Sequence, residues 1–479
     1  AKVLNVSSIK KIIDLMAELK YNHLEVYVEG FSYEYKNIKE ALVDKNYLTQ
    51  EEYLEVEKYA IEKYIDFVPN QNGFGHMSDW LALDKFKELA ECPDGFEIWG
   101  SKRPPSTLDP TNPKSFELVK QMYEEMIPFT KSKYFNMNFD EPYELGHGKS
   151  KQECLKTSTE DVYIEYLEKL ANVVRKYNKT PMIWGDVLVK HPDKISKLSK
   201  DIVFIDWGYN KAYDFVNHAK MLEELKVKYL LAPGTSTWSS ITGRFIDMKE
   251  TIENSTCSSK KYHGLGILLT DWGDMGHLQY LPSSYLGFIY GAMLSWSSGT
   301  IEDAEKYLAI ILNDETLAKV IVELSHYHEL EGEYRDYGTR LFASIMWAEH
   351  GRRQDDKVNF FLNRMKSNII SYEAVQKLHD LFIQEKNKLQ NAKECLEKDE
   401  IKNAILLLET LLDINERLHS YLDNCIVNFD EPIKNLEKYL ENHKKLWLAR
   451  NIKEGYAFSA NRINWLIEML MCLDRKEKI

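Results

Sequence analysis

The sequence predicts an α/β protein: a (β/α)8 barrel of the TIM type, followed by an all-α domain. Three observations carry this prediction. Helical and strand patterns alternate over residues 1–300, several strands end in polar or aromatic residues, and strand patterns cease after about residue 300. With 479 residues the chain is long enough for two domains. We therefore expect a barrel domain at 1–300 and a helical domain at 301–479.

The barrel region begins with a helical pattern, because Ser7 can cap a helix whose apolar residues recur from Ile9 to Leu19. Short apolar runs then predict seven strands, at 24–30, 65–71, 133–141, 181–186, 202–208, 228–234 and 265–273. Helical patterns follow them, at 51–64, 114–128, 159–177, 193–199, 213–226, 245–256 and 284–297. Such alternation predicts parallel strands joined by crossover helices.

A closed barrel and an open doubly wound sheet both fit this alternation. No GxGxxG motif or phosphate-binding loop follows a predicted strand, which argues against a nucleotide-binding open sheet. A barrel active site instead needs reactive and stacking groups at the C-terminal strand ends. Such groups are present at Glu29, Asn70, Asp140, Glu141, Trp184, Trp207, Trp238 and Trp272. A closed barrel also needs an eighth strand, which we expect either to precede residue 1 or to be a strand within the chain that these patterns do not identify.

Beyond residue 300 helical patterns dominate, at 301–312, 314–335, 339–349, 356–445 and 459–473. The charged, amphipathic segment 378–418 indicates antiparallel helices of a bundle. This domain is a structural appendage, completes the active site, or makes a homodimer, and the sequence leaves these alternatives open. If it completes the site, we expect residues 447–451 (WLARN) and Arg462 to reach it.

The composition restricts the classes of partner. A net charge of −13 disfavours nucleic acid, and no apolar stretch is long enough to cross a membrane, so we expect neither as a partner. The first residues lack the apolar region of a signal peptide. The six cysteines are scattered, without metal-ligand spacing, which favours a reducing compartment. We therefore expect a cytoplasmic protein without a metal or other cofactor.

Asp140 and Glu141 are the strongest candidates for catalysis. The chain has 75 acidic residues, so an adjacent acidic pair alone is weak evidence. This pair, however, directly follows the apolar run YFNMNF and precedes Pro142, which places it at the C-terminal end of a strand. Glycoside hydrolysis needs a carboxylic acid to protonate the leaving oxygen. Neighbours in a strand point to opposite faces, so the two acids must divide the work if the strand ends there.

These residues resemble a known family. The segments STLDPTNP (106–113) and FNMNFDEP (135–142) look like the catalytic region of glycoside hydrolase family 20, the β-N-acetylhexosaminidases. Further similar segments, in the family's order, are GFGH (73–76), IWGD (183–186), IDWGY (205–209) and LTDWGD (269–274). The likeness spans residues 8–300 and is greatest to the bacterial branch whose barrel precedes a helical domain.

The resemblance implies a retaining exo-enzyme that releases terminal GlcNAc or GalNAc with help from the substrate's own acetamido group. Glu141 would be the general acid and base, and Asp140 would hold the acetamido nitrogen. Trp184, Trp207 and Trp272 would wall the sugar pocket, and Asp274 would bind hydroxyls. The other substrate-binding candidates are Glu29, His76, Tyr209 and Trp238.

Two departures from the family pattern concern the sugar site. The family's first strand brings an arginine that binds the terminal sugar, and no arginine can be assigned to that role here. The family also uses a tyrosine near the end of the seventh strand, where this chain reads APGTSTWSS. We expect Tyr209 to take its place.

Other functions have weaker support. The histidines do not form a ligand set for a metal-dependent hydrolase. The GxSxG motif of serine hydrolases is absent. The remaining alternative is an inactive carbohydrate-binding protein on the same barrel fold.

Overall fold

Seven parallel chain segments form the barrel wall within residues 3–43 and 45–476, the part of the chain that the computed structural model describes. Six are the strands β1 (His23–Leu24), β2 (Asp66–Phe67), β5 (Tyr134–Asn136), β6 (Thr180–Trp184), β7 (Val203–Trp207) and β8 (Lys228–Ala232). The seventh segment runs beside β8 through parallel bridges at Ile267 and Thr270. The pairing follows chain order, and a parallel bridge between Asn70 and Asn136 joins the β1–β2 pair to the other four strands.

The first strands are shorter than the sequence predicts, because side-chain amides replace the ladder between them. Only Leu24 of the run 24–30 lies in a strand, β1, after which Val28 N donates to Asn70 Oδ1 at 2.8 Å. Asn70 Nδ2 donates back to Val26 O at 2.9 Å. Asn70 therefore supplies the backbone partners that a strand neighbour otherwise provides.

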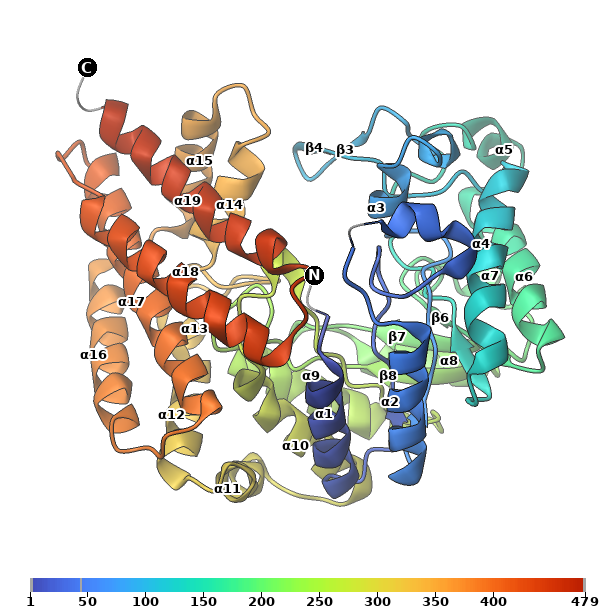
Figure 1. Ribbon diagram of the computed structural model, residues 1–479, viewed down its shortest axis with the longest axis horizontal. Helices are drawn as coiled ribbons and strands as arrows, with labels where there is room; N and C mark the ends of the chain where they lie inside the picture. Colours follow the sequence, from blue (N-terminus) through green and yellow to red (C-terminus); the bar gives the residue numbers. More distant parts are fainter. Residues whose placement is uncertain (1–2, 44, 477–479) are drawn as a thin grey trace.

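Helices cover the outside of the barrel and separate its strands (Figure 1). The longer ones are α1 (Val6–Glu18), α2 (Gln50–Glu62), α4 (Pro113–Met126), α6 (Thr159–Lys176), α8 (Phe215–Glu224), α9 (Phe245–Lys261) and α10 (Tyr285–Trp296). Shorter turns of helix are α3 (Ser78–Leu81), α5 (Lys151–Lys156), α7 (Pro192–Ile195), η1 (Lys36–Leu42), η2 (Lys87–Leu89), η3 (Ile127–Phe129), η4 (Asp274–Gly276) and η5 (Leu281–Ser284). This alternation confirms the predicted barrel class.

Capping residues define where these helices begin. Asn5, rather than the predicted Ser7, caps α1, because its side chain accepts from Ser8 N at 2.9 Å and Ser7 lies inside the helix. Thr49 and Glu52 form a capping box at the start of α2. Asn112 caps α4, which has Pro113 at its first position.

One hairpin lies outside the barrel wall. Its strands, β3 (Phe96–Ile98) and β4 (Ser101–Arg103), pair antiparallel. In Figure 1 this hairpin projects from the barrel toward the helical part of the chain. The sequence analysis assigned no element to these residues.

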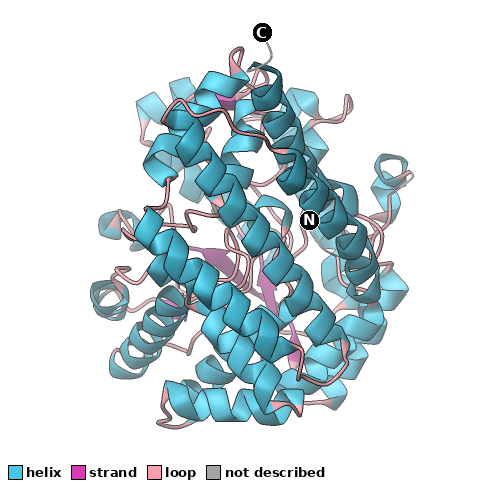
Figure 2. Cartoon of the chain, turned by 90° about the vertical axis from the view of Figure 1, so that its left-hand side faces the viewer, coloured by secondary structure: helices cyan, strands magenta, loops and turns pink. Residues whose placement is uncertain are grey.

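All the regular elements within residues 301–476 are helices (Figure 2). The elements are α11 (Ile301–Leu312), α12 (Glu315–Ser325), α13 (Tyr327–Leu330), α14 (Ala343–Gly351), α15 (Lys357–Met365), η6 (Lys366–Asn368), α16 (Tyr372–Leu389), α17 (Leu396–Leu422), α18 (Asp430–Arg450) and α19 (Tyr456–Lys476). Arg450 lies inside this bundle, where it binds Glu400 at 2.6 Å and Glu397 at 2.8 Å. The WLARN segment therefore packs between helices, and Arg450 is not available to bind a sugar.

The hydrophobic core continues from the barrel into the helical part. A small cluster that includes Val68, Met182 and Ile205 fills the barrel interior. A much larger one joins α9 and α10 of the barrel to α12, α16 and α17, and includes Ile252, Leu317 and Leu408. The predicted boundary at residue 300 divides the chain by the type of its elements. The hydrophobic core, however, includes side chains from both sides of this boundary. None of the described helices is both long and apolar enough to cross a lipid bilayer.

Candidate active site

Four of the predicted site residues meet around the imidazole ring of His76. Its Nδ1 lies 3.3 Å from Glu29 Oε1, and its Nε2 lies 3.2 Å from Asp140 Oδ2 and 3.5 Å from Glu141 Oε2. Glu29 follows β1, His76 follows β2, and the two acids follow β5. All four side chains are partly exposed, so a ligand can reach them.

A left-handed backbone brings both adjacent acids to the same side. The strand β5 ends at Asn136, well before the predicted residue 141. Beyond it the φ angles are positive at Asn138 (61°), Phe139 (76°) and Glu141 (51°). Non-glycine residues rarely adopt this region, and such strain is typical of functional sites. The alternation of a strand is thereby broken, and both carboxylates reach His76 Nε2.

Gly75 permits this close approach. A Cβ atom at position 75 would lie 2.2 Å from the carbonyl oxygen of Asp140 and 3.2 Å from the backbone of Glu141. The loop after β2 therefore packs directly against the backbone of the acidic pair. Only glycine leaves enough room for this contact.

The charges around His76 are strongly coupled. Burial lowers the pKa of His76, but Tyr27 and the carboxylates of Asp140 and Glu141 raise it more, so that the net pKa lies well above the usual value. Burial raises the pKa of Glu141, yet the hydrogen bond and charge of His76 outweigh it and lower the net value. At neutral pH one imidazolium is thus shared by several carboxylates, and the site is negative overall.

Two further acids near this cluster have raised pKa values. Burial, followed by the charge of Asp140, raises the pKa of Asp186 to about 7. Its Oδ2 accepts from the backbone N of Glu141 at 3.1 Å. Desolvation by the surrounding protein raises the pKa of Asp274 to about 6, and the charges of Glu141 and Glu29 act in the same direction. The Asp274 residue is nevertheless accessible to solvent. Asp186 belongs to the IWGD segment, but no sequence pattern predicts a role for it.

The predicted aromatic residues form a continuous group. Trp184 and Trp272 meet with ring centroids 5.7 Å apart, and Trp272 Nε1 donates to the Tyr209 hydroxyl at 2.8 Å. Tyr209 stacks on Trp207 at 5.2 Å and meets the edge of Trp238 at 4.9 Å. Trp207 and Trp272 are partly exposed, whereas the other three are buried behind them. The exposed pair can face a sugar ring, and the buried rings fix its position.

Asparagine side chains connect the acids to these rings. Asn138 Nδ2 donates to Asn72 Oδ1 at 2.8 Å, and Trp184 Nε1 donates to Asn138 Oδ1 at 3.0 Å. Tyr27, whose ring meets Trp272 at 4.8 Å, donates to the same Asn72 oxygen at 3.0 Å. Asn72 lies four residues before His76, and Asn138 lies two residues before Asp140. Their roles depend on contacts between strands, which no local sequence pattern shows.

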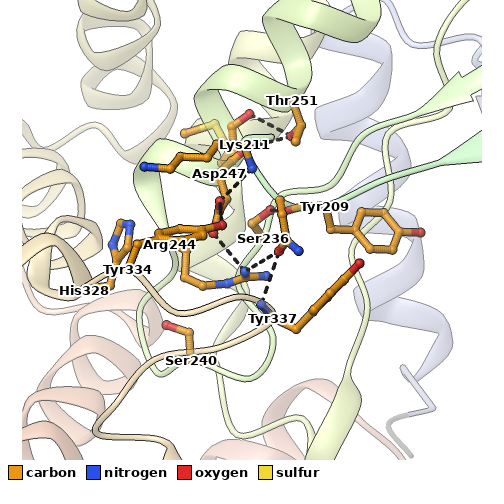
Figure 3. Close-up of polar contacts among 12 residues, drawn as sticks. Tyr209, Lys211, Ser236, Ser240, Arg244, Asp247, Thr251, His328, Tyr334 and Tyr337 are labelled. Carbon is orange, nitrogen blue, oxygen red and sulfur yellow. Dashed lines mark hydrogen bonds and ion pairs between the residues drawn. The ribbon is translucent and has the colours of Figure 1, made fainter. Parts of the chain in front are cut away.

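The helical part adds a residue to the rim of the site. The backbone N of Tyr337 donates to Asn210 Oδ1 at 3.3 Å, and Arg244 Nη1 reaches the same oxygen at 3.5 Å (Figure 3). The Tyr337 side chain is 58% exposed and extends to the same side of this cluster as Tyr209. The charge of Glu141 helps to raise the pKa of Tyr337, after the larger effect of burial. A tyrosine of the helical part therefore contacts the loop after β7 that carries Tyr209 and Asn210, which no sequence pattern predicts.

Comparison with known families and proteins gives one family match. Residues 2–238 match the family described as "Glycosyl hydrolase family 20, catalytic domain". The curated lacto-N-biosidase of Bifidobacterium bifidum is 27% identical over 216 residues, which are 43% of this chain and 18% of that protein. Beta-hexosaminidase subunit A2 of Dictyostelium discoideum is 27% identical over 198 residues, which are 39% of this chain and 35% of that protein. The matched region is therefore a minor part of either relative.

Solved structures show the same fold. Flavobacterium johnsoniae chitobiase has a TM-score of 0.51 and 18% identity, and the match covers 97% of this chain and 76% of that one. An exo β-N-acetylglucosaminidase of Vibrio harveyi, solved with N-acetylglucosamine, has a TM-score of 0.50 and 16% identity over 64% of this chain and 56% of that one. The family match itself contains Glu29, His76, Asp140 and Glu141. Through residues 2–238, the chain belongs to glycosyl hydrolase family 20.

Proposed function

We propose that the protein is a retaining exo-β-N-acetylhexosaminidase that releases terminal GlcNAc or GalNAc through an oxazolinium intermediate. The observation that carries this proposal is a buried acceptor beside an accessible acid. Asp140 Oδ2 faces His76, whereas its Oδ1 is buried and has no hydrogen-bond partner among the described residues. Glu141, the next residue, remains partly exposed.

A buried carboxylate oxygen without a donor is costly, so Asp140 Oδ1 is suited to a donor that the substrate brings. An acetamido N–H is such a donor. Its hydrogen bond would orient the acetamido group so that the carbonyl oxygen attacks the anomeric carbon. The C1–O bond to the leaving group breaks as the new C1–O bond forms, and the resulting oxazolinium cation is stabilised by the negative cluster around it.

Glu141 would give its proton to the leaving oxygen and later take one from the attacking water. In the free protein His76 favours the carboxylate form of Glu141. When a bound sugar excludes water, a neutral pair becomes more favourable than an ion pair, so the proton of His76 can pass to Glu141. Water then opens the oxazolinium ring, and two inversions at C1 give net retention.

The remaining side chains would bind the sugar. The partly exposed rings of Trp207 and Trp272 suit its C–H faces, with Trp184 behind them. Asp274 and Glu29 would accept from its hydroxyls. The Tyr209 hydroxyl already accepts from Trp272 Nε1, and its own proton remains available for the acetamido carbonyl or for Thr270.

Substitution Glu141→Gln tests the acid role. We expect turnover of a GlcNAc β-disaccharide to fall by about 100-fold or more, the usual scale of general acid catalysis. An aryl glycoside with a good leaving group needs less protonation, so its turnover should fall far less in the first step. Steady-state and burst kinetics on both substrates measure this difference. Equal losses on the two substrates would contradict the acid role.

An oxazoline-mimicking thiazoline tests assistance by the substrate. We expect competitive inhibition of the wild type and weaker inhibition of Asp140→Asn, which cannot stabilise the cation. No inhibition would exclude the oxazolinium route. Soluble protein that binds GlcNAc glycosides without any turnover would favour the carbohydrate-binding alternative. Parallel kinetics on GlcNAc and GalNAc β-glycosides would identify the preferred sugar.

A further inference from the structure

A group of arginines lies on the leaving-group side of the active site, and the proposed reaction does not use it. We call Arg103, Arg352, Arg353, Arg364 and Arg462 the arginine cluster. Arg103 ends β4 of the hairpin, Arg352 and Arg353 lie in the turn after α14, Arg364 lies in α15, and Arg462 lies in α19. Figure 1 shows the hairpin extending toward α14 and α15.

A chain of contacts joins the cluster to Glu141. Burial, with the charge of the Glu141 carboxylate, raises the pKa of Tyr143, and the Tyr143 ring meets the edge of Trp99 at 5.0 Å. The Arg103 guanidinium lies over the Trp99 ring, 5.3 Å from its centroid. Trp99 is 60% exposed. The proposed acid is therefore next to an exposed ring and a cation.

The hairpin and the helices hold the other arginines nearby. Ser101 Oγ lies 3.4 Å from His350 Nδ1, and a Cβ at Gly100 would lie 3.0 Å from Arg364 Nη2. On the other side, a Cβ at Gly276 would lie 2.5 Å from Arg462 Cγ. Gly276 is two residues from Asp274, so the predicted approach of Arg462 to the site is supported by this contact.

The positive charge of the cluster is only partly neutralised. Glu349 pairs with both Arg353, at 3.0 Å, and Arg462. Arg103, Arg352 and Arg364 make no ion pair within the described residues, and each lies over a tryptophan ring, at 5.3, 4.1 and 4.9 Å from the centroids. Burial lowers the pKa of His350, and the charges of Arg353, Arg103 and Arg462 act in the same direction. A chain of net charge −13 thus concentrates positive charge here.

We infer that the leaving group is acidic. It is a sugar that carries a carboxylate or a sulfate ester, and the arginine cluster binds this acidic group. This rests on the proposed function, because the leaving group must lie beside the acid that protonates it. Guanidinium groups match planar carboxylates and sulfate oxygens with paired N–H donors. Trp99 offers a face on which the leaving sugar stacks.

The test compares two GlcNAc β-glycosides, with 4-nitrophenyl and 3-carboxy-4-nitrophenyl leaving groups. The preference for the carboxylated substrate, as a ratio of kcat/KM, should fall about fivefold in Arg103→Gln at low salt, the effect of one charge at contact distance in water. Arg364→Gln should lower it as well. In the wild type, about 0.5 M NaCl should reduce the preference through screening.

Lys102→Gln is the matched control. It removes the same charge one residue away on β4, where Lys102 points to the opposite face and packs against the start of the hairpin near Gly95. We expect it to leave the preference unchanged. If the wild type, Arg103→Gln and Arg364→Gln all give the same ratio of kcat/KM for the two glycosides, the inference is overturned. The proposed function would then still stand. No turnover of either glycoside would overturn both.

Paired disaccharides distinguish the two acids. GlcNAc β-linked to glucuronate is compared with GlcNAc β-linked to glucose, and GlcNAc on 6-sulfated galactose with GlcNAc on galactose. The pair with the larger, Arg103-dependent ratio of kcat/KM identifies the preferred acid. Ratios near one for both pairs would overturn the inference for natural leaving groups.

Discussion

At the scale of single residues, Asp186 combines two properties that oppose each other. Its Oδ2 fixes the backbone of Glu141, which requires an acceptor, while burial and Asp140 raise its pKa to about 7. An amide would supply the same acceptor without a charge. The carboxylate therefore costs stability whenever it ionises.

We expect Asp186→Asn to stabilise the protein at high pH. Between about pH 4 and pH 7 the folded protein keeps a proton on Asp186 that the unfolded chain releases, so the free energy of unfolding falls as the pH rises. The shift corresponds to about 4 kcal/mol. Denaturant unfolding of the wild type and the variant should agree at pH 4 and diverge in favour of the variant at pH 8. Equal stability at pH 8 would show that Asp186 has an ordinary pKa.

At the scale of elements, the turn after β5 depends on the loop after β2. Three residues with positive φ would relax toward the strand conformation without an outside constraint. Gly75 provides that constraint, because its α-carbon occupies the space beside the Asp140 carbonyl. The position of both carboxylates is thus determined by a residue of another loop.

The variant Gly75→Ala should lose activity while it remains folded. The added methyl group must displace the backbone of Asp140 and Glu141, and a displacement of about 1 Å costs on the order of 100-fold in rate. Aryl-glycoside kinetics and circular dichroism measure activity and folding. As a control, Gly332→Ala should lower stability because Gly332 has φ 103°, but its added Cβ meets no atom within 4 Å, so kcat/KM should stay near that of the wild type. Near-normal kcat/KM in Gly75→Ala would show that the turn is held elsewhere.

The order of these elements could be predicted from the sequence because each reflects a local period of apolar residues. The helix at 301–312 matches α11, and the runs 181–186 and 202–208 match β6 and β7 within two residues. The strand lengths near the site could not be predicted. Asn70 and Asn136 replace ladder contacts through side chains, and this depends on which strands become neighbours.

The same limit applies to the site. Asp140 and Glu141 were found from their place after an apolar run, and His76 from the resemblance of its segment. Tyr143, Tyr337 and the hairpin around Trp99 carry no such signal. Their positions follow from packing between the barrel and the helices, which a single sequence does not display.

At the scale of the whole molecule, the barrel and the helical part share one core. Side chains of α9 and α10 pack in the same cluster as those of α12, α16 and α17. The Tyr280 hydroxyl bonds to His443 Nδ1 at 2.9 Å, and Asn403 donates to that hydroxyl at 2.8 Å. Neither part can keep its buried surface when separated from the other.

We therefore expect one cooperative unfolding transition for the whole chain. Calorimetry should give a calorimetric enthalpy equal to the van't Hoff enthalpy, despite the length of the chain. The loss of activity on heating should coincide with the loss of helical circular dichroism. Two separate transitions, with an active barrel surviving the first, would contradict this expectation.

The contact between Leu4 and Asn451 has a consequence for how the protein is made. Leu4 bridges Asn451, while Asn5 N donates to Arg450 O and Ile452 N donates to Val3 O, at 3.0 and 2.9 Å. These partners are separated by nearly the whole chain. A ribosome releases residues 450–452 only long after residues 3–5 have emerged. The start of α1 therefore waits for these partners until residue 452 has been translated, and a chain that stalls before residue 450 would expose this edge to chaperones and proteases.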